Sequence, residues 1–211
     1  MQGNNNNAAV WSNGYVLVAP ADAEIPQNGA VFDEAWTSVG YLSGEDGFTE
    51  STETDTEQHR AWGGHLIAVS AANYTITRQF TALESNERTY RLAYPGHSVE
   101  FADDGSGDYE GFINQPQLQD RFRIAFITRT GSAESGFTEK RFVSAGYAMV
   151  TERGDVSETE TDLQSRELTV TFFPASDEES SGGIHYTLPG EESQFPLVYV
   201  WKGDPLAANG S

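Results

Sequence analysis

The sequence predicts a mainly β protein, a sandwich or barrel with one flanking α-helix. Short apolar segments recur along the 211 residues, and 21 glycines together with Thr, Ser and Asn clusters separate them, as in sandwiches and barrels. Several segments alternate between apolar and polar residues, which is the period of a strand with one buried face. A single segment has the end signals of a helix. The length suits one domain with one core.

Turn residues bound each of the segments that we expect to be strands. These segments are Tyr15 to Ala19, Trp36 to Leu42, 65–69, 74–80, 121–126, Phe137 to Val150, 168–172 and Leu197 to Trp201. In the segment 121–126, apolar residues alternate with Arg121 and Arg123, so one face of this strand is expected to be core. The stretch from Phe137 to Val150 is expected to pair with it across a loop around Gly131 to Gly136.

The helix is expected at about residues 85–94. Ser85 is a suitable N-cap, and Glu87 lies in the first turn, where the helix dipole favours an acid. Arg91 lies near the other end, and Pro95-Gly96 stops the helix. The expected packed side consists of Leu83, Tyr90 and Tyr94.

The expected organisation is one domain at 11–201 between a flexible arm at 1–10 and a short tail at 202–211. The arm contains Asn4 to Asn7 and has little to bury. No apolar run approaches the roughly 20 residues of a membrane span, so no membrane insertion is expected. The first basic residue is Arg60, so neither a signal peptide nor a transit peptide is expected at the start.

The charge balance of the chain is strongly acidic. Twelve basic residues against 32 acidic ones give 12 − 32 = −20 at pH 7, and only Lys140 and Lys202 are lysines. A protein that binds nucleic acid needs a positive surface to displace counterions from phosphates. The balance therefore argues against nucleic-acid binding, and it disfavours docking to anionic membranes.

The sequence offers no catalytic signature, so no catalytic residue, cofactor or metal is expected, and the protein is not expected to be an enzyme. Cysteine is absent, which excludes disulfides, thiolate zinc sites and cysteine nucleophiles. Nucleophile elbows, phosphate-binding loops, dinucleotide fingerprints and zinc-protease motifs are also missing. The acidic loop 103–110 has carboxylates for calcium, but it departs from the EF-hand pattern. A solvated turn is the favoured interpretation of that loop.

One pattern in the chain is unusual. Residues 52–57 alternate Thr with acid, and 157–162 alternate Ser or Thr with acid, so a strand there would have no apolar face. One interpretation is an exposed, mobile acidic loop. The other is a strand whose acidic face lines a water-filled space made by several subunits.

The chain resembles a known family in the order of several segments. These segments are Gly14 to Pro20, Ile25-Pro26, Trp36 to Leu42, Asp46 to Ser51, Ala61 to Gly64 and Leu83 to Glu87. Over residues 8–201, their order and spacing resemble the major tail (tail tube) proteins of long-tailed, siphophage-type bacterial viruses, particularly those that infect actinobacteria.

The resemblance implies a tail-tube-type β-sandwich or barrel with a flanking helix, an N-terminal arm, a long stacking loop and a C-terminal extension. Six copies would form a ring, and stacked rings would form the tail tube of the virion, assembled in the host cytoplasm. Gly44 to Trp62 would be the long loop and its following strand. The implied partners are further copies of the chain, the tail terminator, tape measure and distal tail proteins, and double-stranded DNA that passes through without specific binding.

The resemblance also assigns roles to particular residues. Acids facing the lumen would repel DNA phosphates, and the candidates are Glu50, Glu53, Asp55, Glu57, Glu158, Glu160 and Asp162. Phe48 and Trp62 are the candidates for contacts between rings. Phe48 is expected to be buried against the adjacent ring, and the alternative is that it packs on its own sandwich.

Two rival interpretations stay open at this point. The chain could be a stand-alone carbohydrate-binding or adhesin-like module whose tryptophans stack on sugars. Those tryptophans are Trp11, Trp36, Trp62 and Trp201. Alternatively, the acidity could mark the proteome of a salt-loving host, with or without a tail tube.

Overall fold

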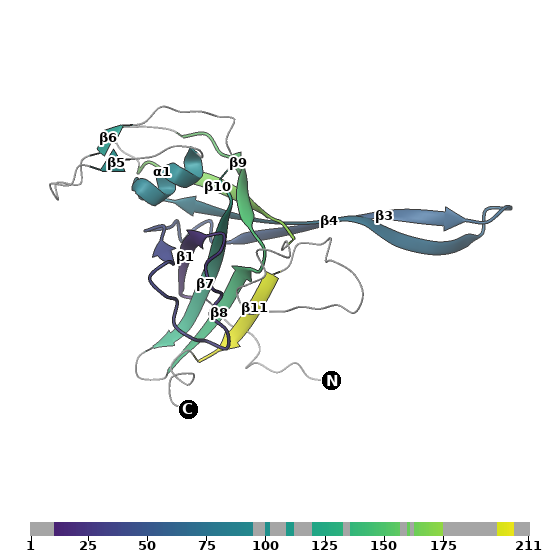
Figure 1. Cartoon of the computed structure of the whole chain (residues 1–211), viewed down its shortest axis with the longest axis horizontal. Coiled ribbons are helices and arrows are strands. Elements are labelled where there is room, and N and C mark those ends of the chain that lie inside the picture. Colours follow the sequence, from purple (N-terminus) through teal and green to yellow (C-terminus); the bar gives the residue numbers. More distant parts are fainter. Residues whose placement is uncertain are drawn as a thin grey trace.

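The structure of the protein is a computed structural model that describes residues 11–94, 100–101, 109–111, 120–132, 136–156, 160, 163–174 and 198–204. Nine strands, all paired antiparallel, form one sheet that folds over into two layers and does not close into a barrel (Figure 1). The mainly β fold class is therefore confirmed, in its open form.

The first layer has the strand order β2-β1-β7-β8-β11, and the second has the order β9-β10-β4-β3. The first layer consists of β1 (Asn13–Pro20), β2 (Thr37–Ser38), β7 (Phe122–Ser132), β8 (Gly136–Ser144) and β11 (Val198–Gly203). The second consists of β3 (Thr49–Arg60), β4 (Leu66–Ala82), β9 (Ala148–Arg153) and β10 (Arg166–Phe172). Pairing of Phe122 with Ala148 joins the layers. A separate pair consists of β5 (Glu100–Phe101) and β6 (Tyr109–Gly111).

Several strand predictions need correction. The strand expected from Trp36 to Leu42 has only the two residues of β2, and the strands expected at 65–69 and 74–80 are one 17-residue strand, β4. The stretch Phe137 to Val150 divides into β8, which pairs with β7, and β9, which pairs mainly with β10. It divides because the chain crosses between the layers after Ser144, so that both pieces face one core.

Aromatic rings from the two layers meet in that core. Phe126 and Phe142 of the first layer contact Phe80 and Phe172 of the second. The ring centroids of Phe80 and Phe126 are 5.7 Å apart, and those of Phe142 and Phe172 are 5.3 Å apart, both edge to face. Such pairs stabilise a core by about 0.5–1.5 kcal/mol beyond the burial of their surface.

Strand β7 is buried on both faces rather than one. Ile124 faces the main core, whereas Ile127 lies in a second apolar cluster that the segment 21–36 covers. Arg123 is only 1% exposed on this second side. Its guanidinium donates to the carbonyl of Ala23, so the arginine holds the covering segment in place.

Strands β3 and β4 extend beyond the rest of the sheet as a two-stranded hairpin (Figure 1). Strand β10 pairs with β4 only between Thr77 and Ala82, so the outer part of β4 has β3 as its sheet partner. The segment Gly44 to Trp62, expected as a long loop and its following strand, is therefore mostly strand, from Thr49 to Arg60. It is ordered because β4 supplies a continuous backbone partner and threonine favours strands.

The helix α1 (Glu87–Ala93) lies within the expected range, but its cap differs. Asn86, not Ser85, is the N-cap, and its side chain accepts hydrogen bonds from the N–H groups of Arg88 and Thr89. The buried residues are Thr89, Leu92 and Ala93. Tyr94 is half-buried and packs against the main core, as expected. The guanidinium of Arg166 lies over the rings of both Tyr90 and Tyr94.

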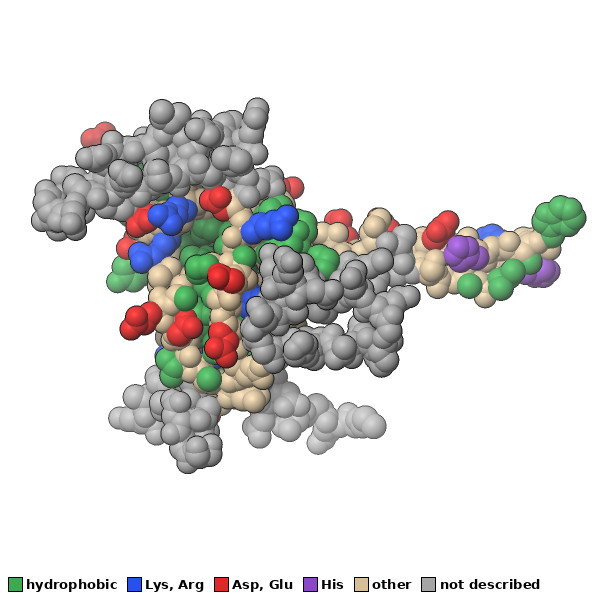
Figure 2. Space-filling view, in the orientation of Figure 1, with side chains coloured by type: hydrophobic (Ala, Val, Ile, Leu, Met, Phe, Trp, Pro, Cys, Tyr) green, Lys and Arg blue, Asp and Glu red, His purple; other side chains and the backbone are tan. Residues whose placement is uncertain are grey.

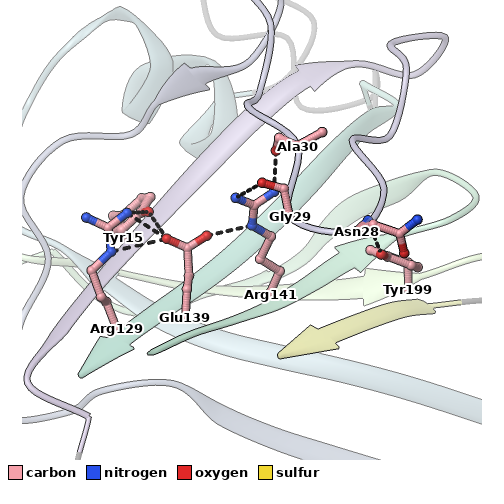
Figure 3. A network of polar contacts seen from close by, with 8 residues as sticks. All are labelled: Tyr15, Asn28, Gly29, Ala30, Arg129, Glu139, Arg141 and Tyr199. Atoms are coloured by element: carbon pink, nitrogen blue, oxygen red, sulfur yellow. Dashed lines mark hydrogen bonds and ion pairs between the residues drawn. The ribbon is translucent and has the colours of Figure 1, made fainter. Parts of the chain in front are cut away.

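A buried charge cluster ties β1, β7 and β8 together (Figure 3). Glu139 is 1% exposed, and its Oε1 accepts from Nε of Arg141 at 2.5 Å. Its Oε2 accepts from Nη2 of Arg129 at 2.6 Å and from the hydroxyl of Tyr15 at 3.1 Å. Arg141 also donates to the carbonyl of Ala30 at 2.6 Å. The cluster therefore fixes both the register of three strands and the covering segment.

The cluster keeps its members in defined protonation states. Burial raises the pKa of Glu139, but hydrogen bonds from Arg129 and Arg141 outweigh burial and hold the pKa below its ordinary value. Burial, followed by the charge of Glu139, raises the pKa of Tyr15 to about 12. The carboxylate therefore stays ionised and the phenol stays a donor across the neutral range.

Replacing Glu139 by Gln should lower the free energy of unfolding at pH 7 by about 3–5 kcal/mol, because Arg129 and Arg141 lose their shared carboxylate. The folded pKa of Glu139 is lowered, so its contribution is complete above the unfolded pKa of about 4.3 and is lost as pH falls through the folded value. Urea unfolding should therefore show a gap between wild type and E139Q that closes in acid.

The matched control is Glu167→Gln, which changes an exposed carboxylate and should alter the free energy of unfolding by less than about 0.5 kcal/mol. Equal losses in the two variants at pH 7 would contradict the role of the cluster.

Candidate functional site

Two surfaces differ in composition from the remaining surface of the residues that the structure describes. They are the outer face of the second layer and the hairpin of β3 and β4. Among the described residues, no group of three or more His, Asp or Glu side chains is placed to hold a metal ion. Within the same part of the chain, no helix has the length and apolar character of a membrane span.

The outer face of the second layer is polar because the core residues occupy the inward positions. Cα partners in antiparallel strands share a face, and Ile76, Phe80, Leu168 and Val170 are buried toward the core. The alternate positions face outward. The polar outward positions are Thr49, Ser51, Glu53, Asp55, Asn73, Thr75, Thr77, Gln79, Thr81, Thr151, Glu152, Glu167, Thr169 and Thr171.

The charge on this polar outer face has a single sign in the described strands. Its charged members are exposed carboxylates, namely Glu53, Asp55, Glu152 and Glu167. The basic residues of the paired parts of these strands take the other side: Arg78 lies opposite Glu50, Arg153 opposite Leu168 and Arg166 opposite Ala82. Arg60, at the end of β3, pairs with Leu66 and alternates away from Glu53 and Asp55. The face therefore presents hydroxyl groups and negative charge to its surroundings.

Three of the predicted lining acids lie on one side of the hairpin. Glu53 and Asp55 belong to the polar outer face, and Glu57 follows them two residues further along β3, paired with Ser70. All three are exposed. Glu152 and Glu167 were not among the predicted acids, although a polar residue, in most cases threonine, stands at every second position of 75–81 and 167–171.

Glu50 lies on the other side of β3 and neutralises a core arginine. Its Oε2 is 3.1 Å from Nε of Arg78, whose guanidinium carbon lies 3.9 Å from the ring centroid of Phe142. Burial lowers the pKa of Arg78, and the charge of Glu50 opposes that effect. Glu50 is therefore not part of the polar outer face, because its carboxylate lies on the opposite side of β3 and forms an ion pair with Arg78.

Phe48 packs on its own sandwich, which is the alternative stated above. Its ring lies edge to face with Phe126, with centroids 5.2 Å apart. A Cβ atom at position 14 would stand 3.1 Å from the ring of Phe48, so glycine there makes room for it. This placement gives no support to burial of Phe48 against an adjacent ring.

The outer part of the hairpin exposes apolar side chains. Trp62 lies in its turn and is fully exposed, at 104% relative accessibility. Ile67, Val69 and Leu66 are each more than half exposed. Figure 2 shows the hairpin as a narrow arm with hydrophobic and histidine side chains toward its end. The hairpin is therefore an uncovered surface with both apolar and acidic groups.

The remaining candidates are only partly placed. Glu160 is exposed. Glu158, Asp162, the arm 1–10, residues 103–108 of the acidic loop and the end of the tail, 205–211, lie outside the described residues.

The four tryptophans have different surroundings. Trp36 is buried, and its Nε1 donates to the carbonyl of Glu24. Trp201 lies against Arg141, and Trp11 lies near Lys202, whereas Trp62 projects from the hairpin. They do not form the shared platform that stacking on a sugar requires.

Comparison with known proteins identifies one family. A family model described as phage tail tube protein matches residues 1–183, and no curated protein sequence matches the chain. A chain of the anti-feeding prophage baseplate is similar with a TM-score of 0.38 and 10% identity, over 78% of this chain and 91% of that one. A chain from the tail of an empty GTA particle has a TM-score of 0.34 and 13% identity, over 74% and 89%. Similarity at this level fixes neither a partner nor an arrangement of subunits.

Proposed function

Because the chain belongs to the phage tail tube protein family, we propose that it forms stacked hexameric rings whose lumen conducts the viral genome into the host. Its place is the tail of the virion, and its role there is structural.

The observation that carries the proposal is the polar outer face of the second layer. A conduit for DNA must not retain phosphates, and a basic lining would bind them by displacing their counterions. Glu53, Asp55, Glu152 and Glu167 place negative charge on this face, and no Lys or Arg accompanies them at its described positions. Facing the lumen, it would repel DNA while threonine hydroxyls kept the wall hydrated.

The second layer also suits a wall built from several copies. It has four strands, and β3 forms one of its edges. An unpaired edge is a template for a strand of another chain. Six copies with four strands each give about 24 strands, a circumference of about 115 Å and a backbone diameter of about 37 Å at 4.8 Å per strand. Strand tilt widens such a barrel further, so a DNA duplex passes.

The hairpin is the proposed contact between neighbouring rings. A two-stranded hairpin is marginally stable alone in water, and its exposed Trp62, Ile67 and Val69 would be covered by another copy. The family also implies contacts with the tail terminator, tape measure and distal tail proteins, and assembly in the host cytoplasm.

Concentrating the purified chain should give rings or hollow tubes in electron micrographs. Trp62→Ala should shorten the tubes, because the exposed indole loses its contact with a neighbour. Leu163→Ala removes another exposed apolar side chain, 78% accessible and outside the hairpin, and should leave the tube length unchanged.

Amide hydrogen exchange of β3 and the outer part of β4 should slow on assembly. Equal protection in monomer and tube would argue against the hairpin contact.

Neutralising the polar outer face should leave tubes intact and slow DNA ejection from assembled particles. The variant combines Glu53→Gln, Asp55→Asn and Glu167→Gln, which removes repulsion between copies as well as repulsion of phosphate. Salt screens such charges only beyond about 8 Å at physiological strength. Ejection is followed by dye binding to released DNA. The control neutralises three exposed acids elsewhere, Asp33, Glu34 and Glu45; equal slowing in both variants would exclude the polar outer face as the lining.

A further inference from the structure

The turn between β3 and β4 holds Trp62 in a defined position. The N–H of Ala61 donates to the carbonyl of His65 at 2.8 Å, and the N–H of Gly64 donates to the carbonyl of Ala61 at 3.0 Å. Gly63 and Gly64 have φ values of 95° and 85°, which residues with a side chain rarely adopt. The turn therefore fixes the backbone that carries Trp62, and the fully exposed indole is available as an interface anchor.

A cleft that suits an aromatic anchor lies between the first layer and the segment 40–48. The cleft has a volume of about 930 Å³ and opens beside the start of β3. Trp11, Tyr41 and Phe48 contribute aromatic side chains to its lining. Its charged lining residues are the cations Lys140, Arg78 and Arg129 and the acid Glu84. Tyr41 is 79% exposed, so the cleft is open to another molecule.

Lys140 lines this cleft, and Lys202 lies beside Lys140 and near Trp11, which also lines it. Lys140 and Lys202 are direct partners across β8 and β11, an arrangement in which like charges destabilise a sheet. No described acid forms an ion pair with either of them. Nζ of Lys202 lies 5.8 Å from the ring centroid of Trp11. The lysine pair therefore favours an approaching group that is aromatic or acidic.

Trp62 cannot occupy the cleft of its own chain. Strand β3 begins next to Phe48, which lines the cleft, and runs for 12 residues away from it. At about 3.3 Å per residue, the strand carries Trp62 about 40 Å away. A cleft that receives this hairpin therefore belongs to a second copy of the chain.

We propose that the Trp62 turn of one copy docks into the cleft of a second copy, with its indole between the lysine pair and the aromatic wall. Indole faces attract ammonium groups, and this is the contact that the docked turn would make with Lys140 and Lys202. This inference rests on the proposed function and names the surface that receives the hairpin.

A double-mutant cycle in the full chain tests the contact. The measured quantity is the chain concentration at which half of the protein sediments as tubes. Trp62→Ala should raise it about tenfold, as loss of an interface anchor does. The pair Lys140→Ala with Lys202→Ala should raise it severalfold, and all three changes together should add little to Trp62→Ala, because groups in contact are not additive.

Arg88→Ala is the control, because Arg88 is exposed on α1. Its effect on the half-assembly concentration should multiply with the effect of Trp62→Ala. Thermal unfolding checks that each variant keeps the stability of the wild type, and Lys→Gln replaces Lys→Ala where it does not. If the effects of Trp62→Ala and of the two lysine substitutions on the half-assembly concentration multiply, the inference is overturned. Normal assembly of the lysine variant with altered retention of duplex DNA would also overturn it. Failure of the wild-type chain to form rings or tubes would reject the proposed function itself, before the cycle is begun.

Discussion

The continuity of β4 is the constraint on which the rest of the structure depends. Its inner half, with Ile76 and Phe80, closes the core against the first layer. Its outer half leaves the core and, with β3 alone as its sheet partner, forms the hairpin. Because residues alternate along the inner half of this strand, it packs the core on one side and presents threonines on the outer face, while its outer half projects beyond the core.

The core also shapes the charge of the surface. Four of the 12 basic residues are buried, namely Arg78, Arg123, Arg141 and Arg166. Their guanidinium groups bind carboxylates, backbone carbonyls or aromatic rings inside the molecule, as desolvated arginines require. Fewer cations therefore remain outside to balance the 32 acids, and the outer face of the second layer is left with carboxylates.

The local signals in the sequence were sufficient for most elements. A short apolar run located β1, alternation located β7 and β10, and the acid and base at its ends located α1. These signals failed where pairing or contact with a distant segment of the chain decides the local structure. The Thr and acid repeat has no apolar face, so its strand form depends on pairing with β4. The N-cap was misplaced by one residue, because Asn86 also donates to the carbonyl of Val39, which only the fold brings near.

The sequence by itself determined the β class, the acidity, the absence of cysteine chemistry and the resemblance to tail tube proteins, because composition and order along the chain carry this information. Only the tertiary structure decided which face each side chain takes. Glu50 and Glu53 are the same residue type three positions apart, yet one neutralises Arg78 and the other lies on the outer face. Strand alternation separates them, and the position of the core relative to β3 decides which side is which.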